Sequence, residues 1–211
     1  TEWSILSVAV TNLIGLFGAR YLKNWKDQKF AQPLFLSTQL LQGLLLFISL
    51  ASVFGNMING DASRGGFAAA ALTWILAAAF YAASDIFVPF LFFPWMAVAS
   101  LFLIPWLFLS TFDASAPAQI VGFVIWGALA ALGSELVHLT GRPALAKYHL
   151  PLLAMSLPLF LVAIMWGFAE DTAYGFTAFL GTGIAYTLIN IFRPRWYVWL
   201  TALLAGLGAY F

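Results

Sequence analysis

The sequence contains no cysteine and very little charge. Charged residues make up 8% of the 211 positions, against about 25% in a typical soluble domain. The absence of cysteine excludes a disulfide framework and a thiolate metal site. The scarcity of charge excludes a water-soluble globular domain, because too few polar side chains are present to cover its surface.

Apolar residues, in contrast, make up 63% of the chain. A helix needs about 20 mostly apolar residues to span the hydrocarbon core of a bilayer. Segments of about this kind lie at 3–22, 33–57, 67–86, 88–112, 118–140, 150–169, 176–192 and 194–211. A transmembrane barrel is excluded because its strands alternate apolar and polar residues, whereas 40–54 and 87–112 are apolar on every side. We therefore predict an all-α polytopic membrane protein, a bundle of eight transmembrane helices arranged as four hairpins in one integral membrane domain, 1–211.

Lysine and arginine are concentrated in alternate gaps between these segments, and cytoplasmic loops carry an excess of both residues. Arg64 alone is expected on the opposite side. The eight that share a side are Arg20, Lys23, Lys26, Lys29, Arg142, Lys147, Arg193 and Arg195. We therefore expect the loops from Lys23 to Lys29, from Arg142 to Lys147 and from Arg193 to Arg195 to be cytoplasmic, and both termini to lie outside a bacterial inner membrane.

Four prolines mark the segments that begin on the basic side. Pro33, Pro89, Pro151 and Pro194 stand at or near the starts of the second, fourth, sixth and eighth segments. Proline is tolerated at a helix start because its missing N–H would have no partner there. The spacing between these prolines is uneven, so an internal duplication and coincidence both remain open.

Three further prolines fall inside segments, Pro94 and Pro105 in the fourth and Pro158 in the sixth. Carriers often bind their solutes where membrane helices are broken near the midplane. Polar residues near these breaks are few: Ser100 and Ser156, with Thr38, Gln39 and Gln42 on the second helix and Asn12 and Thr11 on the first. Such a lining indicates a neutral or lipid-like solute rather than a strongly charged one.

Small residues and aromatic residues divide the helices into two kinds. Membrane helices approach closely where small residues recur every four positions, as Gly127 and Ala131 do in the fifth segment and Ala202 and Gly206 in the eighth. We expect these two helices in the bundle interior. The fourth segment, which carries aromatic side chains around its circumference, is expected to face lipid or a partner protein.

Three tryptophans fall deeper than the aromatic belts that normally mark the membrane interfaces. These are Trp74, Trp95 and Trp126, whose indole N–H groups need acceptors. They are the candidates for contact with a bound apolar cofactor such as a pigment or quinone. A bound lipid is the alternative occupant.

Ionisable side chains inside a membrane point to function, because a charge at the helix centre costs about 2.5–3.5 kcal/mol to insert. Glu135 and His138 lie three residues apart and so share a helix face. Four other polar residues are expected at a comparable depth. The predicted cluster, toward the cytoplasmic end, comprises Arg20, Asp85, Glu135, His138, Asn190 and Arg193.

Two hypotheses account for this cluster. In the structural one, Glu135 forms an ion pair with Arg20 or Arg193. In the functional one, Glu135 and His138 exchange a proton, with Asp85 as a third candidate catalytic residue. We predict no metal, because a di-metal centre needs a second Glu-x-x-His pair and the only other histidine, His149, is expected in a loop.

The layout resembles the small bacterial lysoplasmalogenase-type membrane proteins in its Pro33 near the start of the second helix and its Asp85 at the end of the third. Gln32 stands where that family has lysine, and Ser84 where it has glycine. The fourth helix carries no histidine, unlike the family's. The resemblance therefore implies a shared architecture and not the hydrolytic activity.

Few polar groups occur in the middle of the helices, and this favours a non-catalytic role. We expect an integral membrane subunit or scaffold that packs against other membrane subunits and lipids, with no nucleic-acid partner. The first alternative is a carrier or channel for a small neutral or lipid-like solute. The second is an intramembrane enzyme or proton relay that uses Glu135 and His138.

Overall fold

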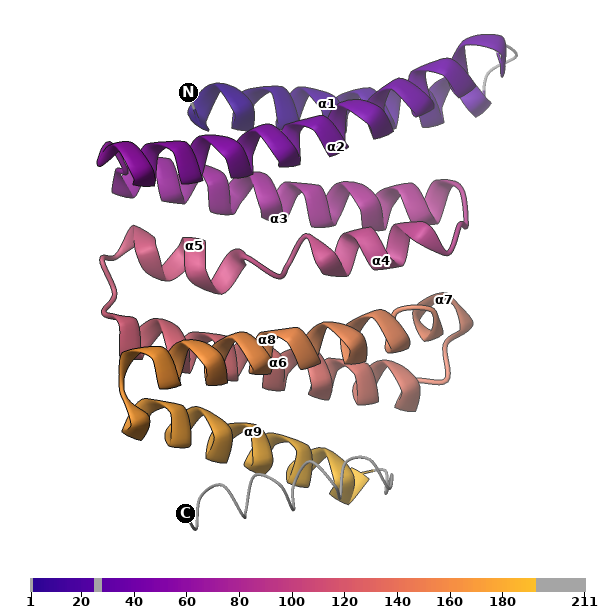
Figure 1. Cartoon of the computed structure of the whole chain (residues 1–211). Helices are drawn as coiled ribbons and strands as arrows, with labels where there is room; N and C mark the ends of the chain where they lie inside the picture. Colours follow the sequence, from indigo (N-terminus) through magenta and orange to yellow (C-terminus); the bar gives the residue numbers. More distant parts are fainter. Residues whose placement is uncertain (1, 25–27, 193–211) are drawn as a thin grey trace. The chain divides into compact units, whose positions relative to one another are not determined.

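The computed structural model describes residues 2–24 and 28–192, and no strand occurs among them (Figure 1). The chain divides into two compact units at Asp113. Unit 1 contains α1 (Glu2–Asn24), α2 (Gln28–Asn59), α3 (Arg64–Phe87), α4 (Phe92–Ala99) and α5 (Ile104–Thr111). Unit 2 contains α6 (Ala116–Leu139), α7 (Pro143–Ala146), α8 (His149–Glu170) and α9 (Thr172–Phe192).

The all-α class is confirmed in the described residues and is consistent with a helical membrane protein, but eight membrane-spanning helices are not found there. Within the described residues, six stretches are long and apolar enough to cross a membrane, and α4 and α5 together form one of them. The segment predicted at 176–192 corresponds to α9, which is not among the six. The segment predicted at 194–211, with Pro194, Ala202 and Gly206, lies outside the described residues. The prediction of a single membrane domain stays a prediction.

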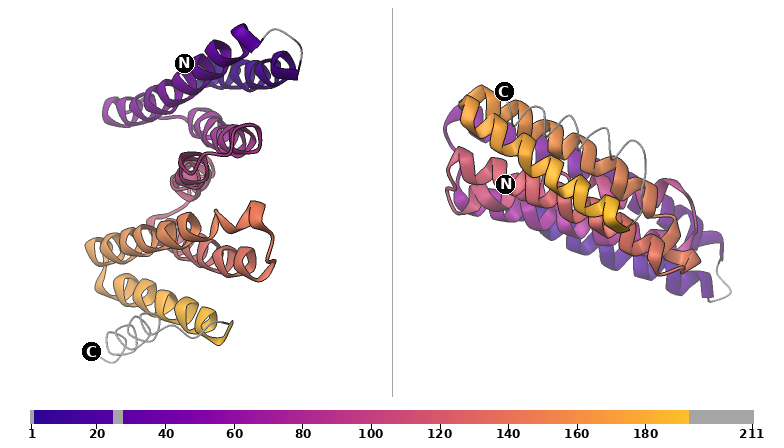
Figure 2. Two further views of the ribbon diagram at one scale, coloured as in Figure 1. Left: turned by 90° about the vertical axis from the view of Figure 1, so that its right-hand side faces the viewer. Right: turned by 90° about the horizontal axis from the view of Figure 1, so that it is seen from below.

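In unit 1, α1 and α2 form a long hairpin and α3 packs against both (Figures 1 and 2). The buried side chains of these helices include Leu16, Phe80 and Leu45. A second apolar cluster, formed by Val53, Ala70, Ala71 and Leu107, joins α2, α3 and α5. The alanine-rich sequence of α3 allows the close approach, since Ala69 and Ala77 are fully buried.

The fourth predicted segment is broken into α4 and α5. The break lies at residues 100–103 rather than at Pro94, which is accommodated within α4. Pro105 sits in the first turn of α5. Its ring would clash with the carbonyl four residues earlier, that of Leu101, if the helix were continuous. Pro105 therefore sets the position of the break.

Two glycines with left-handed backbones end long helices. Gly60 (φ 74°) follows α2, and Gly141 (φ 61°) follows α6. After α2, the N–H of Asp61 donates to the carbonyl of Asn56 at 2.8 Å and the N–H of Gly60 to that of Met57 at 3.2 Å. This is the Schellman pattern, which satisfies the last carbonyls of a helix and depends on a residue that tolerates positive φ.

In unit 2, α8 packs against both α6 and α9, and α6 also contacts α9 (Figure 2). Gly127 of α6 faces the buried ring of Phe160 on α8, and a Cβ added there would lie 2.9 Å from the ring. Gly167 of α8 meets the backbone of Gly175 on α9 just as closely. The small residues of the fifth predicted segment therefore lie against a neighbouring helix inside unit 2.

Two local predictions are wrong. The second helix does not begin at Pro33, because α2 begins at Gln28 and continues through the proline. His149 is not in a loop, because it is the first residue of α8. Both errors have one cause: hydropathy detects the part of a helix that lies in hydrocarbon, whereas polar residues extend a helix into the interface.

Candidate functional site

A buried polar contact of unit 1 connects α1 to α2. Asn12, near the midpoint of α1, donates through Nδ2 to the carbonyl of Thr38 at 2.9 Å and to Oε1 of Gln42 at 3.1 Å. Asn12 is 3% exposed and Gln42 is 1% exposed. Two carboxamides are therefore buried together in the apolar interior of the unit.

A second hydrogen-bonded group, one helical turn away, joins α2 to α3, and the two groups together make up the polar network of unit 1. Gln39, one turn from Gln42 toward the start of α2, donates through Nε2 to Oγ of Ser84 at 2.9 Å. The Ser84 hydroxyl donates in turn to the carbonyl of Phe80 at 2.8 Å. Ser84 and the adjacent Asp85 are both buried on α3, so three helices contribute polar groups to one region.

Three amide atoms of this network retain unused hydrogen-bonding capacity. Among the described residues, Oδ1 of Asn12, Oε1 of Gln39 and Nε2 of Gln42 are buried and make no hydrogen bond. Two of these atoms are acceptors and one is a donor. A buried polar atom without a partner costs about 1–3 kcal/mol, so a further group that hydrogen-bonds them would stabilise the unit.

A pocket of about 500 Å³ lies at the end of unit 1 that carries the basic residues. Its walls come from α1, α2 and the end of α3. The residues that line it are Ala19, Arg20, Lys23, Ala31, Gln32, Phe35, Leu36, Phe87 and Val88. Phe35 and Gln39 are four residues apart on α2, as are Ser84 and Val88 at the end of α3, so the pocket and the network lie on the same helix faces.

Arg20 lies over the ring of Phe87, with its guanidinium carbon 5.3 Å from the ring centre. Among the described residues, no carboxylate forms an ion pair with Arg20. Phe87 is two residues beyond Asp85 on α3, and the prediction that Arg20 and Asp85 occur at a similar depth stays a prediction. The structure thus places one predicted member of the polar cluster on the pocket wall.

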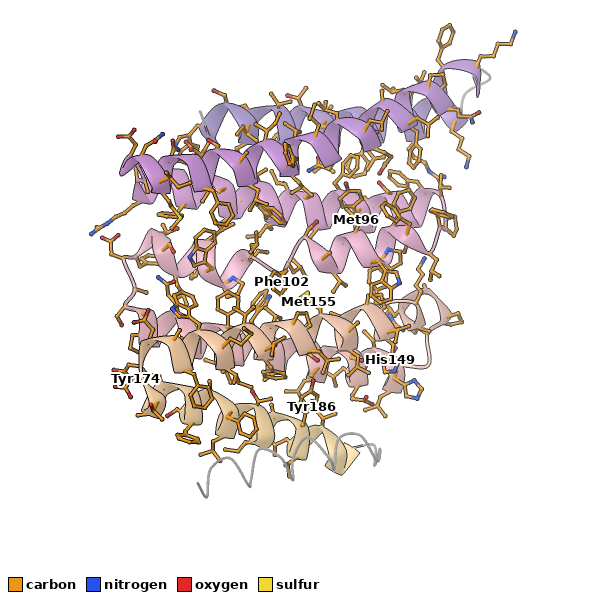
Figure 3. All side chains as sticks on the ribbon, in the orientation of Figure 1. Met96, Phe102, His149, Met155, Tyr174 and Tyr186 are labelled. Carbon is orange, nitrogen blue, oxygen red and sulfur yellow. The ribbon has the colours of Figure 1, made fainter. Side chains whose placement is uncertain are left out.

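Unit 2 contains a separate polar contact between α6 and α8. The hydroxyl of Ser134 donates to the carbonyl of His149 at 2.8 Å and lies 2.7 Å from the ring Nδ1 of His149. The same Nδ1 is 3.0 Å from the carbonyl oxygen of Ser134. Reciprocal bonds of this kind join the end of α6 to the start of α8, where Figure 3 labels His149.

The candidate relay residues lie beside this contact. The rings of His138 and His149 are 5.2 Å apart, and Glu135 is 3% exposed.

Sequence reasoning missed His149, although its position two residues before Pro151 is a typical helix start. Asn190 belongs to α9, but its side chain is not described, and Arg193 lies outside the described residues. The six-residue cluster as a whole stays a prediction.

Ser84–Asp85 of α3 and Ser134–Glu135 of α6 are both buried pairs of a serine followed by an acid, each in the last two turns of a 24-residue helix. A shift of fifty positions (134 − 84) also superimposes the neighbouring buried residues. These are residues 77, 80 and 81 of α3 and residues 127, 130 and 131 of α6. Any two helices that each bury one face share such a spacing, so an internal duplication stays a prediction.

The three deeper tryptophans lie on three different helices. Trp74 packs against the apolar cluster of α2, α3 and α5. Trp95 is 38% exposed on α4, and Trp126 belongs to α6 of unit 2. Their contact with a cofactor stays a prediction. In the described part of the chain, no group of three or more His, Asp or Glu side chains could hold a metal ion.

No protein-family model, curated protein or solved structure matches the chain.

Proposed function

We propose that this protein is a membrane carrier that binds a small neutral or lipid-like solute among α1, α2 and α3. The observation that carries the proposal is the unused hydrogen-bonding capacity of Asn12, Gln39 and Gln42 inside an apolar helical unit. In hydrocarbon no water compensates a polar group. A solute that hydrogen-bonds these amides would remove that cost.

The chemistry of the three atoms defines the solute. The free acceptors of Asn12 and Gln39 require a donor, and the free donor of Gln42 requires an acceptor. A hydroxyl or an amide supplies both. The amides are neutral and would not supply a charge opposite to that of a buried ion, which is costly to bury unpaired. The group that reaches the network is therefore uncharged.

The test compares ligand-induced stabilisation in the wild type and in the double variant Asn12→Leu/Gln42→Leu. Replacing both partners of a hydrogen bond with apolar groups can be nearly neutral for folding. We expect hydroxylated neutral lipids, such as monoacylglycerol, to raise the Tm of the wild type but not of the double variant. A ligand present at 100 times its Kd would contribute about 2.7 kcal/mol.

The matched control is Gln119→Leu. Gln119 lies in unit 2, where its side chain bonds the carbonyl of Ala114 at 2.9 Å. This variant should keep the full ligand response. The proposal fails if no neutral lipid stabilises the wild type, or if the double variant responds as the wild type does.

A membrane-complex subunit is the second candidate function. It is favoured by exposed aromatic side chains on and beside α4 and α5: Phe90, Phe92, Trp95, Phe108 and Phe112. These side chains would pack against other membrane subunits. Purification in mild detergent tests this, because a subunit should retain a stoichiometric polypeptide partner and lose stability when that partner is removed.

For both functions we propose an orientation in the bacterial inner membrane. The end of α1 with Lys23, the start of α2 with Lys29, and the connection between α6 and α8 with Arg142 and Lys147 lie on the cytoplasmic side, with the N-terminus outside. The contact between Arg64 and Asp113, whose Oδ2 accepts from Nε at 2.6 Å, joins the start of α3 to the end of the unit, beyond α5. It supports a shared outer side for these two residues.

A further inference from the structure

We infer that the pocket beside Arg20 binds the anionic head of a membrane amphiphile, a phosphate carried on an acyl chain. The inference rests on the proposed function in that the same three helices hold the solute. It assigns a negative charge to the head group of the ligand, a property about which the neutral amides of the network give no information.

The charge of the pocket identifies the head group. Arg20 and Lys23 stand one turn apart on α1 and both line the pocket, together with the carboxamide of Gln32. No described carboxylate forms an ion pair with either cation. A guanidinium, an ammonium and an amide N–H are the donors that a phosphate prefers.

The remaining wall identifies the rest of the ligand. The pocket also has an apolar wall, formed by Ala19, Ala31, Phe35 and Val88. A free inorganic anion would not cover this wall. A volume of about 500 Å³ falls in the range of small-molecule sites. An acyl chain attached to the phosphate would cover the apolar wall.

The depth of the two sites agrees with one amphiphile. Arg20 is eight residues from Asn12 on α1, or about 12 Å at the helical rise per residue. The cations therefore lie at the membrane interface when the amides lie in hydrocarbon. A lipid with an anionic phosphate at the interface and a hydroxyl or amide below it matches this order.

Lipid retention in native mass spectrometry tests the inference on the full chain. The purified protein is exchanged into detergent with equal amounts of phosphatidylglycerol and phosphatidylcholine. We expect the wild type to retain phosphatidylglycerol in preference to phosphatidylcholine. The Arg20→Gln variant should bind phosphatidylglycerol roughly tenfold or more weakly, because hydrogen bonds to charged groups are stronger than those between neutral groups. Lys29→Gln is the matched control, because Lys29 lies in the same basic region but does not line the pocket.

Three outcomes would overturn the inference. Equal retention of the two lipids would show that the pocket does not select an anionic head group. An equal effect of Arg20→Gln and Lys29→Gln would indicate general attraction of the basic region to anionic lipid. The ligand would be a soluble anion if millimolar inorganic phosphate displaced the lipid and if phosphate alone stabilised the wild type as much as the lipid does.

The outcome also separates this inference from the proposed function. One outcome is that Arg20→Gln leaves phosphatidylglycerol binding unchanged while Asn12→Leu/Gln42→Leu abolishes the response to neutral lipid. In that case the carrier proposal stands and the inference of an anionic head group is wrong. If Arg20→Gln loses phosphatidylglycerol while the double variant responds like the wild type, the pocket alone binds the lipid.

Discussion

Gln39 of α2 donates a 2.9 Å hydrogen bond to the hydroxyl of Ser84 on α3. The bond joins residues 45 positions apart on two consecutive helices. Its acceptor, Ser84, is fully buried and immediately precedes Asp85. The bond places a polar contact between α2 and α3 one helical turn from the contact of Asn12 with Gln42.

Replacing Ser84 by alanine should therefore destabilise unit 1. The Gln39 amide would lose its acceptor, and we expect a loss of about 0.6–2 kcal/mol, the range found for interhelical and buried hydrogen bonds. Unfolding by a denaturing detergent measures the change. Ser37→Ala is the control, because Ser37 is exposed and bonds only the carbonyl of Leu34; a comparable loss in that variant would contradict the assignment.

In unit 2, Ser134 and His149 should be energetically coupled. Each side chain bonds the backbone of the other residue, so the effects of Ser134→Ala and His149→Ala should not add. A double-mutant cycle should give a coupling of at least about 0.5 kcal/mol. Thr177→Val, which removes only a local bond to the carbonyl of Ala173, should show no coupling with His149→Ala. Strictly additive effects of the first pair would refute the contact.

Gly127→Ala should destabilise unit 2 although alanine is the better helix former. The added Cβ would lie 2.9 Å from the buried Phe160 ring, and overpacking of this kind costs about 1–3 kcal/mol. Gly133→Ala is the control, since its nearest neighbour is 3.8 Å away, and it should be neutral or stabilising. Rescue of Gly127→Ala by Phe160→Leu would identify the steric cause; a neutral Gly127→Ala would refute it.

The contact between Arg64 and Asp113 should contribute little to stability. Both side chains are mostly exposed, 71% and 58%, and exposed ion pairs typically contribute about 0–1 kcal/mol. The position of the pair can be tested in this naturally cysteine-free chain. A short bifunctional thiol reagent should join the cysteines of Arg64→Cys/Asp113→Cys. It should not join those of Arg64→Cys/Val88→Cys, at opposite ends of α3, and equal cross-linking of both variants would contradict the placement.

The sequence was sufficient to predict the helical membrane class and most helix positions, because uninterrupted apolar runs of about 20 residues are typical of membrane-spanning helices. It could not predict that α2 starts at Gln28, since polar interfacial residues such as Lys29 carry no hydropathy signal. An interruption at Pro105 was predictable, because proline has no N–H to donate to the carbonyl of Leu101 four residues earlier.

The candidate site was predictable only in part. Asn12, Gln39 and Gln42 stood out as rare polar residues, yet no local pattern pairs Asn12 with Gln42 or Gln39 with Ser84. Those pairings depend on which helices pack together and at what rotation, and this is decided by the buried faces of α1, α2 and α3. His149 was missed because its role arises from contact with Ser134, fifteen residues away.

The proposed function depends above all on whether Asn12, Gln39 and Gln42 bind a solute inside unit 1. Native mass spectrometry of the gently purified protein detects such a solute, with the wild type compared to Asn12→Leu/Gln42→Leu. We expect a bound amphiphile with a hydroxyl or amide group in the wild type and its loss from the folded double variant. A wild type without any retained small molecule, or the same molecule retained equally by both proteins, would contradict binding at these residues.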